Sequence, residues 1–506
     1  MTAGYTYAGA PSTLVPFDPF KTLDWSSIQS RVKRLQMRIA KAVRDKRYGK
    51  VKTLQWLLTH SYDAKLLAVK RVTENRGKRT PGIDGVLWTT PMSKLTAVQS
   101  LKRRGYNPQP LRRIYIPKRN KKQRPLGIPT MADRAQQALH LLALEPVAET
   151  LVDKNAYGFR PKRGAADAIE QCFIALARRN CARWILEADI AACFDRISHQ
   201  WLLENIPMDK TVLGKWLASG YIDNNVFNPT IEGTPQGGII SPTLMNLTLR
   251  GLEETVKKSV PRGSKVNIII YADDFVITGA LKEMLETTIK PIVEAFLQER
   301  GLELSVEKTR ITHIDKGFDF LGFNIRKYKG KLLIKPAKGS VKDFLQGIRE
   351  TIKTHKTAAA VNLIYLLNQK IRGWVNYFRH VVSKKTFAYV DDQIFQCLWS
   401  WCKRRHPTKN TLWIQKKYFR SQYTRSWILF APNSKGFRPL PCIDLVKASD
   451  MPIRRHIKIR DKANPYDPAY EEYFVKRDQA KVNARRQRVG PRYLHMGTEF
   501  LSHTGS

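Results

Sequence analysis

The sequence predicts an α+β fold divided into several domains, and three observations support this. The chain has 506 residues, 42% of them hydrophobic, which is enough for roughly two to four domains. Strand-like apolar runs are concentrated between about residues 185 and 335. Apolar residues at helical spacing dominate on both sides of that region. Because the helical stretches do not alternate regularly with the strands, a parallel βαβ array is not predicted.

The charge of the chain points to a polyanionic partner. Lys and Arg number 88 against 43 Asp and Glu, which gives a net charge of +45 at pH 7. Nucleic acid is the first candidate, because phosphate neutralisation releases counterions. An anionic membrane surface is the weaker alternative. No apolar run approaches the roughly 20 residues that cross a bilayer, and the N-terminus lacks a secretion-signal pattern, so we expect no membrane partner.

The first part of the chain combines an expected tail with a basic helical region. Residues 1–24 are rich in Gly, Pro, Ser and Thr and predict an extended tail. Apolar residues recur at helical spacing from Trp25 to about Lys70. Residues 31–130 contain 27 Lys and Arg but only 4 Asp and Glu. A solvated helix face would mix both signs, so we interpret this region as a nucleic-acid-binding surface. The candidate RNA contacts on its first helix are Arg31, Lys33, Arg34 and Arg38.

Two hairpins are predicted in the middle of the chain. The β-prone runs 265–270 and 275–279 flank the tetrapeptide 271–274, and residues 319–334 predict a second hairpin. Residues 340–405 are again helical, and several prolines interrupt the chain from Pro407 onwards. Residues 401–506 carry a net charge of +15. The six cysteines form no Cys-x-x-Cys pair, so we expect buried free thiols and no structural zinc.

Three aspartates are the candidates for the chemistry. Asp273 and Asp274 lie between two apolar strands, where an ordinary exposed hairpin turn is the competing interpretation. Asp189 directly follows a strand-like run, in the stretch 187–199. Two-metal phosphoryl transfer needs carboxylates that converge from separate elements, with two Mg²⁺ ions about 4 Å apart. Hard oxygen ligands suit Mg²⁺. We therefore predict that these three side chains meet.

Two further segments are candidates for binding a nucleotide. In residues 233–242, Gln236 offers a donor and an acceptor, and Gly237 allows close backbone approach; the alternative is a plain turn before a helix. Lys118 and Arg124 lie six residues apart on a basic hairpin and can hold a triphosphate. Generic contact with an RNA backbone is the alternative for this pair.

Seven sequence blocks in this order resemble the reverse transcriptases encoded by bacterial group II introns. They are IPKRNKKQRPLGIPTMADR (116–134), YGFRPKRGAADAI (157–169), EADIAACFDRISH (187–199), GTPQGGIISP (233–242), YADDF (271–275), LSVEKTR (304–310) and FLGF (320–323). The resemblance covers roughly residues 25–480. It implies a right-hand polymerase with fingers, a palm containing an antiparallel sheet, and a helical thumb. RGWVNYF (372–378) resembles the signature of the thumb, which is called the maturase or X domain.

The resemblance also implies domain limits. We expect a tail (1–24), an N-terminal extension with fingers (25–185, joined by about 225–242), a palm (186–335), a thumb (336–410) and a small basic DNA-binding region (411–506). Many relatives continue into a zinc-bearing HNH endonuclease built on Cys-x-x-Cys pairs. The sequence stops at Ser506 without them, so we expect that this activity is absent or that the sequence is truncated.

Site residues follow from the same resemblance, position by position. Asp189, Asp273 and Asp274 match the catalytic aspartates, and the carbonyl of Ile190 is a further metal contact. Phe194 matches the residue that stacks under the sugar and excludes a 2′-hydroxyl. Lys118 and Arg124 match residues that bind the triphosphate, Gln236 and Gly237 match the loop of the nucleotide pocket, and Lys308 matches a phosphate contact. The primer-grip region is matched by Phe320, Leu321, Gly322 and Phe323.

The function that these observations imply is RNA-directed DNA synthesis with two Mg²⁺ ions and dNTP substrates. The expected partners are the group II intron RNA in a ribonucleoprotein, whose splicing the protein assists, an RNA template with a DNA primer, and a DNA target for retrohoming. The expected location is the bacterial cytoplasm. One alternative is a splicing-only maturase on a polymerase scaffold, which loss of an aspartate would favour. Another is a reverse transcriptase of a defence system or other host pathway.

Overall fold

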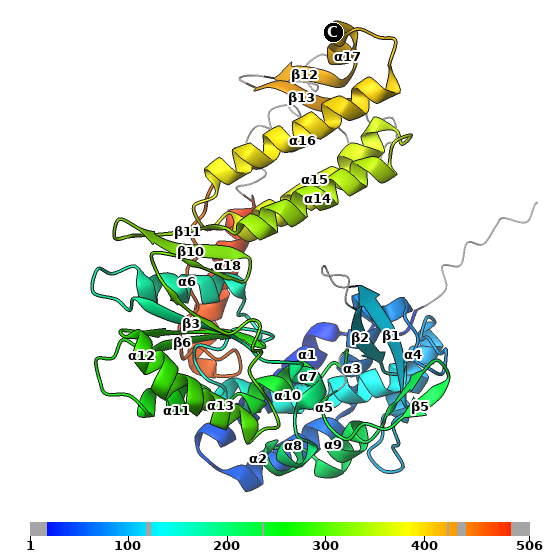
Figure 1. Cartoon of the computed structure of the whole chain (residues 1–506). Coiled ribbons are helices and arrows are strands. Elements are labelled where there is room, and N and C mark those ends of the chain that lie inside the picture. Colours follow the sequence, from blue (N-terminus) through cyan, green and yellow to red (C-terminus); the bar gives the residue numbers. More distant parts are fainter. Residues whose placement is uncertain (1–17, 118–122, 235–236, 423–424, 433–441, 487–506) are drawn as a thin grey trace, which may run out of the picture.

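The computed structural model describes residues 18–117, 123–234, 237–422, 425–432 and 442–486. Lys118 and Gln236, which the sequence predicts to contact a nucleotide, lie outside these residues. Helices and sheets are segregated into bodies rather than alternating, so the predicted α+β class is confirmed (Figure 1). Among the described residues, no helix is both long and apolar enough to cross a membrane.

A layer of helices forms the N-terminal body. The helical spacing from Trp25 onwards folds as three helices, which pack around the long and almost fully buried α5. On the first of them, Ile28, Val32, Ile39 and Val43 form the buried stripe. The elements are α1 (Trp25–Arg44), α2 (Tyr48–His60), α3 (Tyr62–Glu74), η1 (Arg76–Arg79), α4 (Pro91–Ser100) and α5 (Met131–Leu151).

Next to this layer lies a four-stranded sheet with the order β2-β1-β4-β5. The strands are β1 (Leu111–Pro117), β2 (Gln123–Ile128), β4 (Tyr221–Asp223) and β5 (Val226–Asn228). β1 pairs antiparallel with β2 and parallel with β4, about a hundred residues further along the chain. We call this sheet the fingers sheet. Two helices precede its second hairpin, α8 (His199–Asn205) and α9 (Lys210–Leu217).

The central body, which we call the palm, is an antiparallel sheet with the order β6-β7-β3-β8. Its strands are β3 (Trp184–Asp189), β6 (Asn267–Tyr271), β7 (Asp274–Gly279) and β8 (Arg310–His313). Both predicted strands around the tetrapeptide 271–274 are present. The sheet separates two apolar cores: Leu186 and Phe275 belong to one, Ile185 and Val276 to the other. The palm helices are α6 (Ala165–Leu176), α7 (Cys193–Arg196), α10 (Ser241–Thr248), α11 (Leu252–Lys258), α12 (Lys282–Met284), the π-helical η2 (Leu285–Ile289) and α13 (Lys290–Gln298).

A small sheet connects the palm to a three-helix layer that we call the thumb (Figure 1). The sheet has the order β11-β10-β9, with β9 (Phe318–Phe320), β10 (Phe323–Tyr328) and β11 (Lys331–Pro336). The predicted turn at Lys329-Gly330 has both residues at positive φ, which makes the tight β10–β11 hairpin possible. The thumb helices are α14 (Lys338–Thr354), α15 (Ala360–Phe378) and α16 (Lys384–Arg405).

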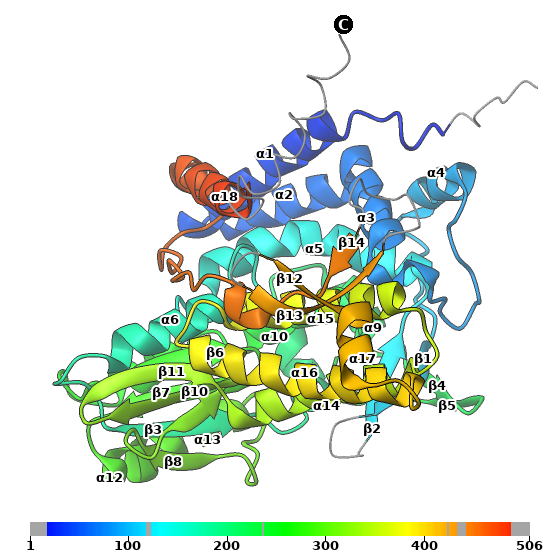
Figure 2. The same cartoon turned by 90° about the horizontal axis from the view of Figure 1, so that it is seen from above.

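The chain after the thumb does not form one separate unit, in contrast to the expected region 411–506. Its first part packs on the thumb: Phe419, Leu429 and Ala431 belong to the same core as the thumb helices. This part comprises α17 (Thr411–Tyr418), β12 (Phe419–Gln422), β13 (Arg425–Pro432) and β14 (Cys442–Asp444). The second part returns past the palm to α1, through η3 (Ala448–Asp450), η4 (Pro468–Tyr470) and α18 (Glu471–Arg486), as Figure 2 shows. All six cysteines are free; three of them are buried.

Candidate active site

The three predicted aspartates come from two adjacent strands and the turn between β6 and β7. Asp189 is the last residue of β3 and lies opposite Asp274, the first residue of β7. Asp273 occupies the turn before Asp274. The amide of Ile190 donates a 3.0 Å hydrogen bond to the Asp273 carbonyl and so joins the end of β3 to this turn. The sheet and its turn therefore place the backbones of the three residues side by side at one end of the palm sheet.

The turn that carries Asp273 is supported by the segment 155–158. The amide of Tyr157 donates to the Ile270 carbonyl, and the Ile270 amide donates to the Asn155 carbonyl, both at 2.9 Å. Ala272 has a φ of +61°, in the left-handed region. Gly158 lies directly against it, and a Cβ on Gly158 would overlap the Ala272 backbone nitrogen. Only glycine fits this contact, so the block 157–169 has a structural role in shaping the turn.

Burial and mutual repulsion disfavour the charged forms of the carboxylates. Burial, followed by the charges of Asp189 and Asp273, raises the pKa of Asp274 to about 7. Burial and the charge of Asp189 also raise the pKa of Asp273, against the opposing effects of Lys308 and Arg124. Both shifts favour the neutral carboxyl over the carboxylate, so Asp273 and Asp274 gain from a nearby cation.

The side chain of Lys308 forms an ion pair with Asp189. Its ammonium is 2.8 and 2.9 Å from the two carboxylate oxygens. Burial acts to lower the pKa of Lys308, but the contact with Asp189 outweighs this and raises it. The sequence resemblance implied a phosphate contact for this residue; the structure places it on the carboxylate. Glu187 lies two residues before Asp189 on β3. Its carboxylate accepts hydrogen bonds from Arg310 at 2.7 and 2.9 Å and from the Thr312 hydroxyl at 2.8 Å.

The chemistry of the donor set suits Mg²⁺. Among the described residues, no three Asp, Glu, His or Cys side chains are grouped closely enough to hold a metal as they stand. Burial, and after it the negative charge of the neighbouring aspartates, nevertheless raises the pKa of Asp273 and Asp274, and a divalent cation relieves the repulsion. Carboxylate oxygens are the ligands that Mg²⁺ prefers. The residues present therefore fit the ion that the family implies.

Phe194 lies five residues after Asp189, on a turn that the loop 233–234 holds in place. The Gly233 amide donates to the Ile197 carbonyl at 2.8 Å, and the Thr234 amide donates to the Phe194 carbonyl at 2.5 Å. Gly233 has a φ of +85°, and a Cβ there would lie 2.6–2.7 Å from backbone atoms of Phe194 and Asp195. The ring of Phe194 meets that of Phe159 at 6.5 Å, edge to face. The turn is thus held by backbone contacts, and the ring that it carries lies against that of Phe159.

The same loop joins the palm to the fingers sheet. Gly237 has a φ of +112°, and a Cβ there would lie 2.7 Å from the Gly127 carbonyl oxygen of β2. Arg124 on the same strand lies opposite Ile116 of β1. Its charge lowers the pKa of Asp273, so its guanidinium acts on the carboxylate cluster. Arg124 thus acts on the aspartates, and Gly237 packs against the strand that carries Arg124, whereas Lys118 and Gln236 lie outside the described residues.

The predicted primer grip packs against the thumb. Phe320 ends β9 and Phe323 begins β10, and Leu321 and Gly322 between them both have positive φ. The Tyr377 hydroxyl donates to the Leu321 carbonyl at 2.9 Å, and its ring stacks on Phe323 with centroids 5.2 Å apart. Tyr377 belongs to the block 372–378, so the two predicted motifs touch.

Two of the four predicted RNA-binding residues are engaged within the protein. Arg31 forms a two-point ion pair with Asp63 of α3, at 2.5 and 2.8 Å. Lys33 pairs with Glu471 of α18 at 2.5 Å. Arg34 and Arg38 are exposed, and neither has an ion-pair partner among the described residues. These two remain available to a ligand.

A second basic and aromatic surface on α2 was not predicted. Tyr48, Lys52, Trp56 and His60 follow at four-residue intervals and are all exposed. Tyr48 and Trp56 are 52% and 57% exposed, and Trp56 stacks on His60 with centroids 4.3 Å apart. The helix contains no acidic residue. The i, i+4 spacing of aromatic and basic residues was the signal in the sequence that could have found it.

Comparison with known protein families agrees with this geometry. Residues 116–325 match "Reverse transcriptase (RNA-dependent DNA polymerase)", residues 20–101 match "N-terminal domain of reverse transcriptase", and residues 341–419 match "Group II intron, maturase-specific domain". The last match includes α17, beyond the expected thumb limit at 410.

Three curated relatives show how far the similarity extends. Protein YkfC of Escherichia coli is 32% identical over 314 residues, which cover 53% of this chain and 81% of that protein. Group II intron-encoded protein LtrA of Lactococcus lactis is 30% identical over 396 residues, covering 65% of this chain and 63% of LtrA. A 91 kDa protein in the cob intron of Schizosaccharomyces pombe is 28% identical over 66% of this chain and 52% of its own length. With the aspartates gathered on the palm, these matches confirm the resemblance: the chain belongs to the family of group II intron reverse transcriptases with a maturase domain.

Proposed function

We propose that the chain is the RNA-directed DNA polymerase of a mobile group II intron, which binds its intron RNA, assists splicing and copies the intron into cDNA during retrohoming. The observation that carries this proposal is the cross-strand pair Asp189 and Asp274, with Asp273 in the adjoining turn. Carboxylates that converge from separate elements are what two-metal nucleotidyl transfer requires.

The aspartates and the Ile190 carbonyl are the proposed ligands of two Mg²⁺ ions. When bound, the ions activate the primer 3′-hydroxyl and stabilise the leaving pyrophosphate. Asp274, whose pKa is about 7, gives up its proton as the cation binds. Lys308 neutralises Asp189 beforehand and, once released, offers its ammonium to a phosphate.

The nucleotide lies between the fingers sheet and the palm in this proposal. Lys118 and Arg124 hold the triphosphate of the dNTP, and Gln236 and Gly237 line the pocket. Phe194 lies under the sugar and leaves no room for a 2′-hydroxyl. Phe320, Leu321 and Gly322 hold the primer, with Tyr377 of the thumb fixing the turn from behind.

Intron RNA contacts the outer face of the N-terminal helices. Arg34 and Arg38 of α1 supply charge. On α2, Trp56 and Tyr48 supply exposed rings on which unpaired bases stack, with Lys52 between them. The remaining proposed partners are an RNA template with a DNA primer and a DNA target site. The proposed location is the bacterial cytoplasm, in a ribonucleoprotein and without a membrane partner.

Primer extension on an RNA template, beside splicing of the intron RNA, tests the proposal. We expect Mg²⁺-dependent extension by the wild-type protein and none by Asp273→Ala, with RNA binding retained. Asp315→Ala is the matched control, because Asp315 is a well-exposed palm carboxylate away from the cluster. Splicing without any extension by the wild-type protein would instead establish the splicing-only maturase.

A further inference from the structure

After the thumb, the chain crosses the back of the palm as a strap, which we define as residues 448–478. Figures 1 and 2 show it running from the base of the thumb past α6 to α18, which lies beside α1. Apart from this strap, the described chain passes from the palm to the thumb at one connection, β11 to α14, and the two bodies share an apolar core that includes Val276 and Leu345. A second crossing adds polar contacts to this core and so further restrains movement of the thumb relative to the palm.

At its first end the strap is anchored to the thumb. Asp391 of α16 accepts hydrogen bonds from the amides of Ala448 at 2.6 Å and Ser449 at 2.8 Å. Lys384 donates to the carbonyls of Ser449 and Met451 at 2.6 and 3.0 Å. The amide of Arg454 donates to the carbonyl of Arg379, directly after α15, at 2.9 Å.

At the palm the strap converges on one buried carboxylate. Asp167 of α6 is 3% exposed. One of its oxygens accepts from the His456 ring at 2.8 Å, the Ile459 amide at 2.7 Å and Arg477 at 3.0 Å. Burial acts to raise the pKa of Asp167, but these donors outweigh it and lower it. A buried charge whose donors come mainly from another segment strongly favours attachment of that segment.

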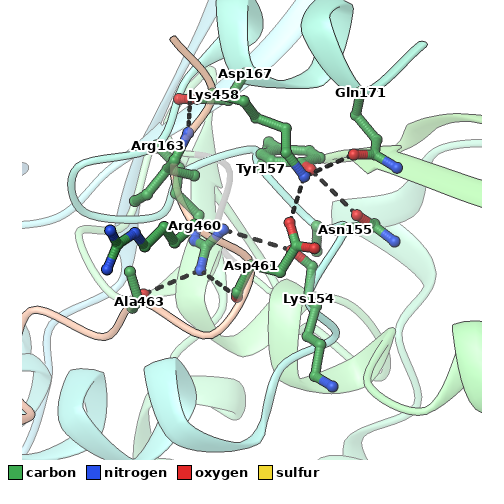
Figure 3. Close-up of polar contacts among 12 residues, drawn as sticks. Lys154, Asn155, Tyr157, Arg163, Asp167, Gln171, Lys458, Arg460, Asp461 and Ala463 are labelled. Atoms are coloured by element: carbon green, nitrogen blue, oxygen red, sulfur yellow. Dashed lines mark hydrogen bonds and ion pairs between the residues drawn. The ribbon is translucent and has the colours of Figure 1, made fainter. Parts of the chain in front are cut away.

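A second contact holds the strap to the loop behind the carboxylate cluster. Arg163 donates to the carbonyls of Asp461 and Ala463, both at 3.1 Å, as Figure 3 shows. In the same view Lys458 reaches Gln171 of α6 at 2.6 Å. The strap is therefore fixed to the palm at two points as well as to the thumb.

His456 connects the two attachments. Its ring lies 6.1 Å from that of His380, in the loop between α15 and α16. The ring of His380 in turn lies 5.2 Å from that of Phe323, next to the primer-grip turn. The side chain that binds the palm carboxylate thus also adjoins a thumb loop that contacts the primer grip.

We propose that the strap ties the thumb and the primer grip to the palm through Asp167 and His456, and that this tie sets how many nucleotides are added in one binding event. The inference rests on the proposed polymerase function. A thumb that rotates freely releases the primer–template duplex sooner, while the addition of a single nucleotide at the aspartates is little affected. Asp167 and His456 are positioning residues in this scheme and touch no substrate.

The test compares His456→Ala with His456→Gln, which restores a side-chain donor, and with the control His313→Ala. His313 is also a histidine beside a carboxylate, Asp315, but it lies on β8 away from the strap. Product length is measured with a trap that captures released enzyme, and the first addition is measured in a single turnover. We expect His456→Ala to shorten the product by about two- to thirtyfold, the range for mutations in a coupled network, with partial rescue by Gln.

A second measurement separates this inference from the polymerase proposal. Amide hydrogen exchange of residues 320–323 and 378–382 reports the stability of the primer-grip turn and of the α15–α16 loop without any polymerisation. We expect faster exchange there in His456→Ala and no change in His313→Ala. Unchanged exchange, or equal losses in product length and first-addition rate, would overturn the tie. If the wild-type protein extends no primer but His456→Ala still exchanges faster than wild type, the polymerase function is refuted while the attachment of the thumb through His456 is supported.

Discussion

Gly158 lies against the backbone of Ala272 so closely that no side chain fits between the two residues. Ala272 has a left-handed backbone and directly precedes Asp273. The position of this carboxylate is therefore set from behind by a residue that has no chemistry of its own.

We expect Gly158→Ala to reduce primer extension by at least about a hundredfold, because a displacement of about 1 Å at reacting groups has this effect. The added methyl group must push the turn at Ala272 away from the palm. Gly164→Ala is the control, since a Cβ at Gly164 meets no atom within 4 Å and its φ is extended. Equal activity of the two variants would show that the turn adjusts freely.

The pKa of Asp274 predicts how stability depends on pH without Mg²⁺. A folded-state pKa of about 7, above the ordinary value of 3.8, means that the folded state disfavours the charged carboxylate. This destabilisation is absent below about pH 4, grows up to about pH 7 and is constant above. We expect Asp274→Asn to unfold at a higher temperature than wild type, by more at pH 8 than at pH 5. Saturating Mg²⁺ should reduce the difference in unfolding temperature between Asp274→Asn and wild type. An increase in unfolding temperature that is the same at both pH values would contradict the raised pKa of Asp274.

Proton and cation should also compete in catalysis. The wild-type protein should need more Mg²⁺ for half-maximal extension at pH 6 than at pH 8, because Asp274 must lose its proton to bind the ion. Titration of Mg²⁺ at several pH values measures this directly. A requirement that does not change with pH would mean that Asp274 stays ionised throughout.

Phe194 should govern the choice of sugar. We expect Phe194→Val to raise incorporation of ribonucleotides relative to deoxyribonucleotides by about tenfold or more, since the smaller side chain leaves room for a hydroxyl. Phe159→Leu, which removes the exposed ring next to Phe194 without adding a β-branch at its positive φ, is the control. If only Phe159→Leu changes the ratio, the wrong ring has been placed under the sugar.

The outer face of α1 and α2 should affect splicing more than extension. Arg34→Gln with Arg38→Gln should lower the salt dependence of intron binding by a slope of about two, one for each lost phosphate contact. Trp56→Ala should weaken binding without changing that slope, because stacking releases no counterion. Lys282→Gln with Lys290→Gln removes the same charge from the palm and serves as the control. Equal losses of splicing and extension would assign this face to the template path.

The sequence was most informative where chemistry and local pattern coincide. Asp189 and the tetrapeptide 271–274 lie at strand ends, and the apolar β-prone runs beside them predicted these strands, which the structure pairs in one sheet. Side-chain ion pairs between residues far apart in the sequence could not be predicted from local patterns. Nothing local to Lys308 indicates that it contacts Asp189, 119 residues away, and Arg31 looks like its exposed neighbours although it binds Asp63. The contacts of the strap were hidden for the same reason: nothing local to Lys458 or Arg477 indicates that they bind Gln171 and Asp167 of α6.

The pair Lys33–Glu471 also has a consequence for biosynthesis. The two side chains are 438 residues apart in sequence, yet they lie 2.5 Å apart in the fold. At a translation rate of about 5–20 residues per second, the ribosome needs about 20–90 s to deliver the second partner after the first. Throughout that interval the basic helix α1 is outside the ribosome without α18 beside it. A nascent chain therefore exposes more positive charge than the finished one, at a time when its own messenger RNA is still close by.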